Sequence, residues 1–556
     1  MRTAALGSCS LPNGDANFPA NSQKVVLRVS GGELEAPLVQ AFDRLDVEGQ
    51  ARVDEIPPGE GMTVDVVACA EDGAATWAGV SGVFDILEIG AETVVDIFLT
   101  PQNQFARTGR CPDSATDQSH PASGHAYGAI TVDGDSAWIL GGFGQMSGKS
   151  LQASDAVEAY DRNTSRFASA GALSEPRAMA LVQPVGDGLV RLVGGVAEVT
   201  AAEYKLPSLA ATAGPANGIE YYDVTTGQPA GTVDQDFPAL PSVVGLADGR
   251  AVVVGGAEDL SDPDAPVYSK DAWVVPAGQP TATEIAQRRL DLGLARYGAT
   301  VVPAGDGVLV WGGAVEREDS LEAPPIAQWI DADTDSVTVL DVAAGVANTM
   351  FGAGQHIDTV SDVHRFVVLG GARIDFDAEP PYNLAVNGAH GVLVTVDAQT
   401  GSVDVADLTS LWPSQAGQLQ RAGASIYALT DDSFWFVGGY QSFTASDPGP
   451  CGEAGVCMPP QTLGLQFTLN ESGTLDASAE VSHSLPAQDG WNTGPFGAMA
   501  AQQFDGSWLV IPGFSTESVK EAASTSAAPT GQGALIRFEV AAAELCEVDV
   551  EDELSP

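Results

Sequence analysis

The chain has 556 residues, and its 24 Lys and Arg residues against 74 Asp and Glu residues give a formal net charge of −50. A surface this acidic repels phosphate, which excludes nucleic acid and anionic lipid as expected partners. The apolar fraction of 44% argues against intrinsic disorder, and no stretch reaches the roughly 18 uninterrupted apolar residues of a membrane-spanning helix.

The composition also predicts an all-β protein, because 63 Gly and 34 Pro residues accompany few helix-forming runs. Only five of the basic residues are Lys, a pattern that resembles proteins from high-salt habitats. We therefore expect the folded state to become more stable from low to molar salt, because ions screen the repulsion among carboxylates. Thermal melting across that range tests this, and an unchanged melting temperature would show that the acidity is no salt adaptation.

Residues 1–23 are predicted to be a linker, and they carry one motif. The segment Leu6-Gly7-Ser8-Cys9 resembles the lipobox that precedes the acylated cysteine of bacterial lipoproteins. This resemblance implies that Cys9 is lipidated and that the linker is an anchor region. The other interpretation is an accidental match, because a four-residue motif has a high false-positive rate.

Residues 24–101 are predicted to form a small antiparallel β-sandwich. Short alternating runs are separated by the turn signals Pro57-Pro58-Gly59 and Asp72-Gly73. The expected strands are 25–29, 62–68, 83–87 and 93–99. The module resembles the immunoglobulin- or transthyretin-like modules at the start of bacterial surface proteins.

After this module, an apolar β-rich run ends seven times in a glycine pair or its near equivalent. Successive pairs are 53 to 74 residues apart, which indicates one supersecondary unit with loops of variable length. The pairs are Gly141-Gly142, Gly194-Gly195, Gly255-Gly256, Gly312-Gly313, Gly370-Gly371, Gly438-Gly439 and the degenerate Pro512-Gly513.

Each of these runs is predicted to be the second of four antiparallel strands. A turn signal such as Asp133-Gly134 precedes the run and joins it to a first strand. First strands contain small residues such as Gly128-Ala129, as strands crowded around a common axis require. A third strand ends in an Asp-led turn such as Tyr160-Asp161, which leads to an outer fourth strand.

Seven such units predict a seven-bladed β-propeller, and at this point the sequence resembles the kelch-repeat family. The glycine pairs, the Tyr-Asp turns and arginines near the start of several units carry the resemblance over about residues 112–545; these arginines are Arg177, Arg296 and Arg421. The regular Trp after the Tyr-Asp turn is missing. The resemblance implies a propeller over residues 111–548, before an acidic tail at 549–556, and it implies no single activity.

The six cysteines suggest an oxidising compartment. Cys451 and Cys457 flank a Gly-rich turn and are expected to pair. Cys111 and Cys546 lie at the two ends of the expected propeller, where a bridge would hold the ring closed. Cys9 and Cys69 would then remain for the N-terminal module, and Cys69 would be an unpaired thiol if Cys9 is acylated.

The segment after each glycine pair is long, roughly 13 to 23 residues, where a few would close a hairpin. We call these seven segments the crown, because corresponding loops of a propeller emerge on one face. Loops often carry function, so the crown is the expected binding surface; the alternative is drift in loop length. Its candidate binding residues are Phe143, Tyr204, Tyr268, Phe376, Tyr382, Tyr440, Phe443 and Phe514.

The crown also contains carboxylates, so weak calcium binding is expected to be the protein's only cofactor chemistry. Copper-radical oxidases of the galactose oxidase type share the predicted architecture. Their chemistry needs two Tyr, two His and a Cys cross-linked to a Tyr, and no Tyr-His dipeptide occurs here. We expect His356 and His364, on adjoining strands of the fifth unit, to have a structural role.

The sequence therefore predicts a non-catalytic extracytoplasmic protein, with no expected catalytic residue, that binds a protein or glycan through the crown. One alternative is a carbohydrate-active propeller enzyme, either an oxidase or a lyase. A second is a structural subunit of a cell-surface assembly.

Overall fold

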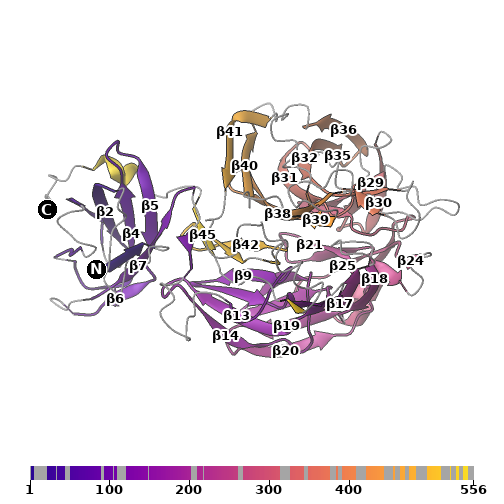
Figure 1. Ribbon diagram of the computed structural model, residues 1–556, viewed down its shortest axis with the longest axis horizontal. Helices are drawn as coiled ribbons and strands as arrows, with labels where there is room; N and C mark the ends of the chain where they lie inside the picture. Colours follow the sequence, from indigo (N-terminus) through magenta and orange to yellow (C-terminus); the bar gives the residue numbers. More distant parts are fainter. Residues whose placement is uncertain are drawn as a thin grey trace.

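The protein was analysed as a computed structural model, shown in Figure 1. The residues that it describes are 2–5, 22–32, 34–43, 51–54, 56–88, 93–103, 106–108, 121–147, 150–201, 210–216, 218–260, 267–313, 326–342, 349–375, 383–385, 391–408, 421–443, 455–457, 464–469, 475–483, 497–511, 513–514, 526–527, 534–537 and 543–548. These residues are mostly in β-strands, with one short α-helix and one 3-10 helix among them. The expected all-β class is confirmed.

The N-terminal module is a seven-stranded sheet in the order β1-β7-β5-β4-β2-β3, with β6 paired to β4. Its neighbours are antiparallel except for the parallel pair β1 and β7. The strands are β1 (Arg2–Ala5), β2 (Lys24–Ser30), β3 (Leu38–Asp43), β4 (Gly59–Cys69), β5 (Ala75–Val80), β6 (Phe84–Ile86) and β7 (Asp96–Pro101).

Both faces of this sheet are apolar, because β2 carries buried residues on each of them. Val25 and Leu27 belong to a cluster on one face, and Val26 belongs to a cluster on the other. The second face is covered by the other end of the chain, where the 3-10 helix η4 (Ala543–Glu547) places Leu545 and Cys546 against Val26. Both chain ends therefore lie beside the same sheet (Figure 1).

Seven further sheets follow, and within the described residues each has the same four-strand antiparallel core. The first three are sheet 1 with β9 (Ala129–Asp133), β10 (Ser136–Leu140), β13 (Ala156–Asp161) and β14 (Arg166–Ala172); sheet 2 with β15 (Leu181–Gly186), β16 (Leu189–Val193), β19 (Ile219–Asp223) and β20 (Gln228–Val233); and sheet 3 with β21 (Ser242–Gly245), β22 (Ala251–Val254), β25 (Asp271–Val275) and β26 (Arg289–Asp291). Helix α2 (Ala282–Gln287) lies before β26 and begins with a capping box at Thr281.

The remaining four sheets repeat this order. They are sheet 4 with β27 (Thr300–Ala304), β28 (Gly307–Trp311), β29 (Ile326–Asp331) and β30 (Ser336–Asp341); sheet 5 with β31 (Ala353–Val360), β32 (Val363–Leu369), β35 (Val392–Asp397) and β36 (Ser402–Asp407); sheet 6 with β37 (Ala422–Ala428), β38 (Ser433–Phe443), β40 (Gly464–Leu469) and β41 (Leu475–His483); and sheet 7 with β42 (Met499–Gln502), β43 (Trp508–Ile511), β45 (Ala534–Ile536) and β8 (Ala106–Arg107). The outer strand of sheet 7 therefore comes from before sheet 1.

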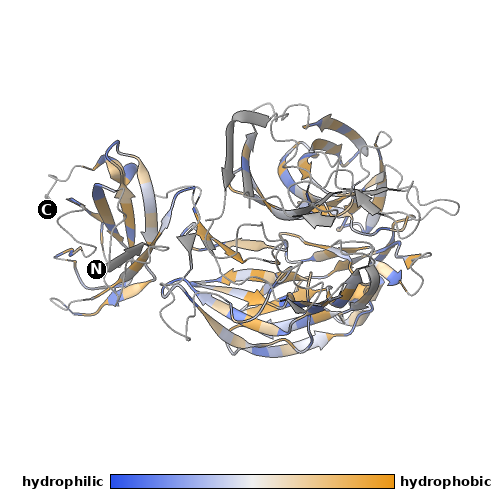
Figure 2. Ribbon diagram, in the orientation of Figure 1, coloured by the Kyte–Doolittle hydropathy of each residue, from blue (hydrophilic) through white to orange (hydrophobic). Residues whose placement is uncertain are grey.

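Neighbouring sheets share apolar clusters, and these clusters close a cycle. In sheet 4, for example, Val308 and Val310 pack toward sheet 3, whereas Leu309 and Trp311 pack toward sheet 5. Similar clusters join every consecutive pair of sheets, including sheets 7 and 1. The central strands are accordingly hydrophobic along their length (Figure 2), and the arrangement is consistent with a propeller-like fold.

The glycine pairs lie where one sheet approaches the next. A Cβ on Gly141 would overlap the carbonyl oxygen of Arg177 in the next sheet, and Gly142 N donates a hydrogen bond to that oxygen at 2.7 Å. The pairs at Gly255 and Gly370 make the same approach to the next arginine. The repeat therefore needs glycine because of the contact between sheets.

A ring of residues with positive φ surrounds the inner end of the first strands. Its seven members are Tyr127, Met179, Leu240, Gly298, Phe351, Gly423 and Gly497, with φ between 54° and 73°. Hydrogen bonds link this inner ring from sheet to sheet, such as Tyr127 N to Gly497 O at 2.8 Å and Met179 N to Tyr127 O at 2.7 Å. Its four large side chains are apolar or aromatic.

The inner ring allows a matched test of packing. Gly298 has φ +66°, and a Cβ there would meet the Phe351 ring at 2.7 Å, whereas a Cβ on Gly305, with φ +57°, would meet nothing within 4 Å. We expect Gly298→Ala to cost about 1–3 kcal/mol more unfolding free energy than Gly305→Ala, because both strain the backbone but only the first overpacks. Urea unfolding measures both, and equal losses would contradict the tight packing of the ring.

The N-terminal module is joined to sheets 1 and 7 by polar contacts. Arg162 of sheet 1 donates to Val80 O and pairs with Asp135 at 2.5 Å. A small cavity of about 10 Å³ lies beside these groups, between the module and the two sheets. It has room for roughly one water molecule, so it is no ligand pocket.

The structure corrects one cysteine pairing. Cys546 is bonded to Cys69, with a Cα–Cα distance of 5.7 Å, and so it does not pair with Cys111, which lies outside the described residues. The physical reason is that η4 returns to the N-terminal sheet instead of ending at the ring. The bond also excludes Cys9–Cys69 pairing; Cys9 itself lies outside the described residues, so its lipidation stays a prediction.

Candidate functional site

The crown segments form a second layer of strands at one end of the ring. After the glycine pairs of sheets 1, 2 and 7, they build a five-stranded sheet in the order β18-β17-β12-β11-β44. Its strands are β11 (Phe143–Ser147), β12 (Ser150–Ala153), β17 (Val196–Ala201), β18 (Ala210–Pro215) and β44 (Ser526–Ala527). Segments that are far apart in the sequence therefore form one platform.

Three further crown segments also form strands within the described residues. Those of sheets 3 and 5 fold back as the pairs β23 (Ala257–Asp259) with β24 (Val267–Tyr268) and β33 (Arg373–Asp375) with β34 (Asn383–Ala385). In sheet 6 the long strand β38 continues past its glycine pair, and β39 (Gly455–Cys457) pairs with its end. Cys457 therefore lies in β39; Cys451 lies outside the described residues, so their pairing stays a prediction.

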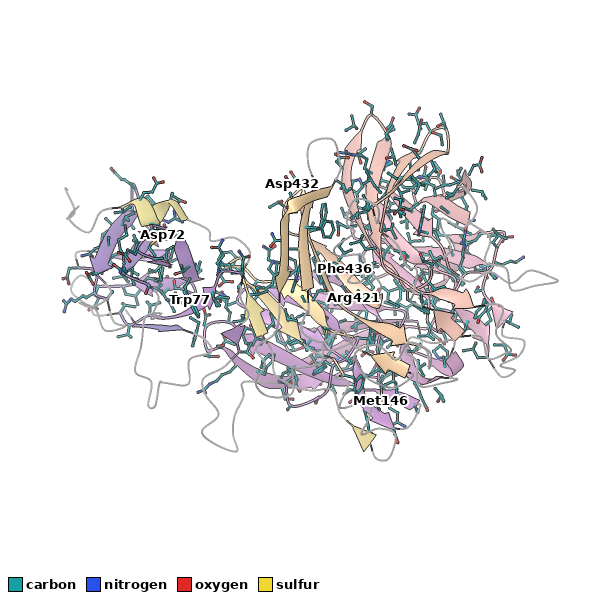
Figure 3. The ribbon with its side chains drawn as sticks, turned by 45° about the horizontal axis from the view of Figure 1, so that its top comes forward. Asp72, Trp77, Met146, Arg421, Asp432 and Phe436 are labelled. Carbon is teal, nitrogen blue, oxygen red and sulfur yellow. A yellow bond between two sulfur atoms is a disulfide. The ribbon has the colours of Figure 1, made fainter. Side chains whose placement is uncertain are left out.

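An apolar cluster fills the space between the crown and the inner ring. It contains Phe143, Tyr268 and Phe514, which are all buried, together with crown residues such as Met146, which is labelled in Figure 3. Tyr127 contacts Phe143 edge to face at a centroid distance of 6.3 Å. The crown is thus held on the ring by its own hydrophobic core.

Three of the candidate binding residues, which we expected on the surface, are therefore buried. Phe143, Tyr268 and Phe514 lie in the core, so they position the crown and present no surface to a partner. Tyr204, Phe376 and Tyr382 lie outside the described residues. Tyr440 and Phe443 lie in β38, where their side chains are not described. For these five residues a binding role stays a prediction.

Among the described residues of the crown, most exposed side chains are polar or acidic. They include Gln145, Gln152, Glu198, Glu258 and Asp259. Gln152 and Glu198 are directly opposite each other on β12 and β17, and Ser150 Oγ donates to Glu198 Oε1 at 3.0 Å. Hydrogen-bonding side chains on a packed platform suit recognition of hydroxyl, amide or cationic groups.

Buried arginines hold the start of several sheets. Arg177 Nη1 donates to Gly194 O and Arg296 Nη1 donates to Gly312 O, both at 2.5 Å, so each reaches the glycine pair of its own sheet. Burial lowers the pKa of Arg296 and of Arg421 to about 10. Arg421 also lies 5.9 Å from the centroid of the Phe436 ring (Figure 3). The arginines of the repeat motif are therefore structural.

Two histidines form a cluster on the first hairpin of sheet 5. His356 of β31 and His364 of β32 are half-buried, with ring centroids 5.9 Å apart. Thr359 Oγ1 lies 3.0 Å from His356 Nε2 and 2.8 Å from His364 Nδ1. His364 stacks on Trp329 of sheet 4 at 4.9 Å. The pair therefore lies at the boundary between sheets 4 and 5.

This histidine pair predicts a dependence of stability on pH. Burial lowers the pKa of both side chains, and the neighbouring imidazole lowers that of His356 further, although Asp358 and Asp362 oppose these effects. The unfolded chain therefore binds protons first as the pH falls below the ordinary value of about 6.5, so the folded state loses stability there.

The test replaces both histidines with Gln and measures urea unfolding from about pH 7.5 to about pH 5.5. We expect the wild-type protein to lose more stability over this range than the double variant. Asp358 stays paired with Arg365 throughout, so the comparison isolates the imidazoles. Identical pH profiles would contradict the prediction.

In the part of the chain that the structure describes, no group of three or more His, Cys, Asp or Glu side chains is arranged to hold a metal ion. Within the same residues, no helix has both the length and the hydropathy that crossing a bilayer requires.

Comparison with known proteins gives only distant likenesses, all of them to solved structures. The chain matches no protein-family profile, and no curated protein matches it. The solved structure of YjhT is similar with a TM-score of 0.37 and 15% sequence identity, over 64% of this chain and 98% of that chain. A likeness this weak supports no argument, so the fold is described from the sheets and the contacts between them.

Proposed function

We propose that this protein is a seven-bladed kelch-like β-propeller, preceded by an immunoglobulin- or transthyretin-like sandwich, that binds a protein or glycan through the crown without catalysing a reaction. The seven four-stranded sheets are its blades. The crown segments of blades 1, 2 and 7 pair with one another to form one platform. The five-stranded crown sheet is the observation that carries the proposal.

The construction of the crown supports binding over drift in loop length. Loops that drift have no reason to pair with each other, yet β12 of blade 1 pairs with β17 of blade 2, and β11 pairs with β44 of blade 7. The platform also rests on a packed apolar core, which fixes its exposed side chains in place. Rigid elements position recognition groups more accurately than isolated loops do.

The disulfide supports an extracytoplasmic location, because such bonds persist mainly in oxidising compartments. A carbohydrate-active enzyme would need a catalytic centre at the axis or the crown. The large side chains of the inner ring, Tyr127, Met179, Leu240 and Phe351, instead pack in the apolar cluster beneath the crown. Metal analysis of the purified protein tests that alternative, and a stoichiometric redox metal would favour it.

A glycan array and a crosslinking screen with surface proteins test the crown as the binding face. We expect Gln152→Ala with Glu198→Gln to abolish binding, because these residues face each other at the centre of the crown sheet. Asp404→Asn on the outer strand β36 is the control, since it removes the same charge far from the crown. Equal binding by both variants would place the partner elsewhere.

Calcium is proposed only as a weak ligand of acidic loops. Addition of a chelator to the purified protein should lower the melting temperature slightly if the ion is bound in the folded state. An unchanged melting temperature would dismiss calcium.

A further inference from the structure

We propose that His356, His364 and the turn between them form a binding site for a divalent transition-metal ion, with Cu²⁺ or Zn²⁺ as its chemical class of ligand. The site lies on the β31–β32 hairpin of sheet 5, away from the crown, and so it does not depend on the proposed function.

The geometry comes from one shared hydroxyl group. His356 Nε2 and His364 Nδ1 both point at Thr359 Oγ1, at 3.0 and 2.8 Å. Two imidazole nitrogens that converge on one point supply two of the donors of a tetrahedral or tetragonal ion, with metal–nitrogen bonds of about 2.0 Å, and water would supply the others. Rotation of the exposed Thr359 side chain and a small approach of the two rings leave that point to the ion.

The strands hold both rings close to this position. His356 and His364 lie on paired antiparallel strands, and a register shift between His356 and Asp358 brings Thr359 opposite His364. His364 stacks on Trp329 at an interplanar angle of 23°, and His356 packs against Phe366 at 5.3 Å. Two rings that packing has already oriented lose little entropy when they bind an ion.

The chemistry of the surroundings fits a cation. Burial lowers the pKa of both imidazoles and so favours the neutral form, which is the form that binds metal. Asp358 and Asp362 flank the pair, and Arg365 neutralises only Asp358. Imidazole donors favour Cu²⁺ over the other divalent ions of the first row, whereas hard ions such as Ca²⁺ and Mg²⁺ prefer oxygen.

Titration with Cu²⁺ in excess Mg²⁺ tests the site, because Mg²⁺ occupies the many surface carboxylates. Trp329 stacks on a ligand, so its fluorescence is the local readout. We expect saturable quenching with one Cu²⁺ per chain, and at least about tenfold weaker binding in His364→Gln and in His356→Gln. In Trp329→Phe the ion should still bind by calorimetry while the quenched component disappears.

The variants separate this site from other modes of binding. The apo variants at pH 7.5 should still unfold in one cooperative transition, which separates loss of the ion site from loss of the fold. Unchanged Cu²⁺ affinity in both histidine variants would overturn the proposal and place the ion on carboxylates or elsewhere. Crown variants such as Glu198→Gln should bind Cu²⁺ with wild-type affinity. The Cu²⁺ titration therefore tests the histidine site independently of whether the crown binds a partner.

Discussion

Replacing both Cys69 and Cys546 with Ser is expected to lower the free energy of unfolding by about 2–5 kcal/mol. The bond joins residues 477 positions apart, so it restricts the unfolded chain over almost its whole length. It also holds η4 on the second face of the N-terminal sheet, where Leu545 packs beside Val26. Loss of the bond therefore exposes apolar surface as well as freeing the unfolded chain.

Urea unfolding of the double variant against the oxidised wild type measures this loss. A reductant alone is an incomplete test, because it would also break a Cys451–Cys457 bond. Lys24→Met is the matched control: Lys24 Nζ donates to Cys546 O at 2.6 Å and to Val548 O at 2.7 Å, so the variant weakens the docking of η4 and keeps the bond. A double variant as stable as the wild type would mean that the disulfide contributes nothing to stability.

The seven sheets could be predicted because their signals are local and repeated. Gly141-Gly142 and its counterparts mark the approach of one sheet to the next, and Asp133-Gly134 closes the hairpin from β9 to β10 as predicted. Each signal acts within a few residues of itself, which is where sequence patterns are informative. Because the same signals recur in each unit, the strand order inferred for one unit applied to all seven.

The closure of the ring and the path of the chain end could not be predicted in this way. Strand β8 has two residues and η4 has five, which is too short for any periodic pattern. What places η4 is the apolar character of both faces of β2, visible in the run of Val25, Val26 and Leu27. A sheet that is apolar on both faces needs two covers, and that signal was available in the sequence.

The aromatics of the crown show where composition alone misleads. Tyr268 follows Glu258 and Asp259 in one crown segment, which suggested a mixed binding surface, yet Tyr268 lies in the core while Glu258 and Asp259 face solvent. In β24 the strand period of two separates exposed Val267 from buried Tyr268, because neighbouring residues of a strand point to opposite faces. Treating the long loops as strands would have predicted it.

A second large effect is expected at the junction between sheet 7 and the N-terminal module, where Arg537 and Asp505 form a buried ion pair. Arg537 is fully buried, its Nη2 lies 2.8 Å from Asp505 Oδ2, and its Nη1 donates to Asp505 O. Burial lowers the pKa of Arg537, whereas Asp505 opposes that effect. We expect Arg537→Met to cost about 3–5 kcal/mol, because it leaves a buried carboxylate without its counter-charge.

A double-mutant cycle separates the pair from simple loss of packing. Arg537→Met with Asp505→Asn should cost less than the sum of the two single variants, because the double variant leaves no unpaired charge in the interior. Arg365→Met is the matched control, since its pair with Asp358 is partly exposed and should be worth less than about 1 kcal/mol. Additive losses in the cycle would show that Arg537 acts through its contacts with Asp505 O and the surrounding backbone, and that its charge contributes little to the junction.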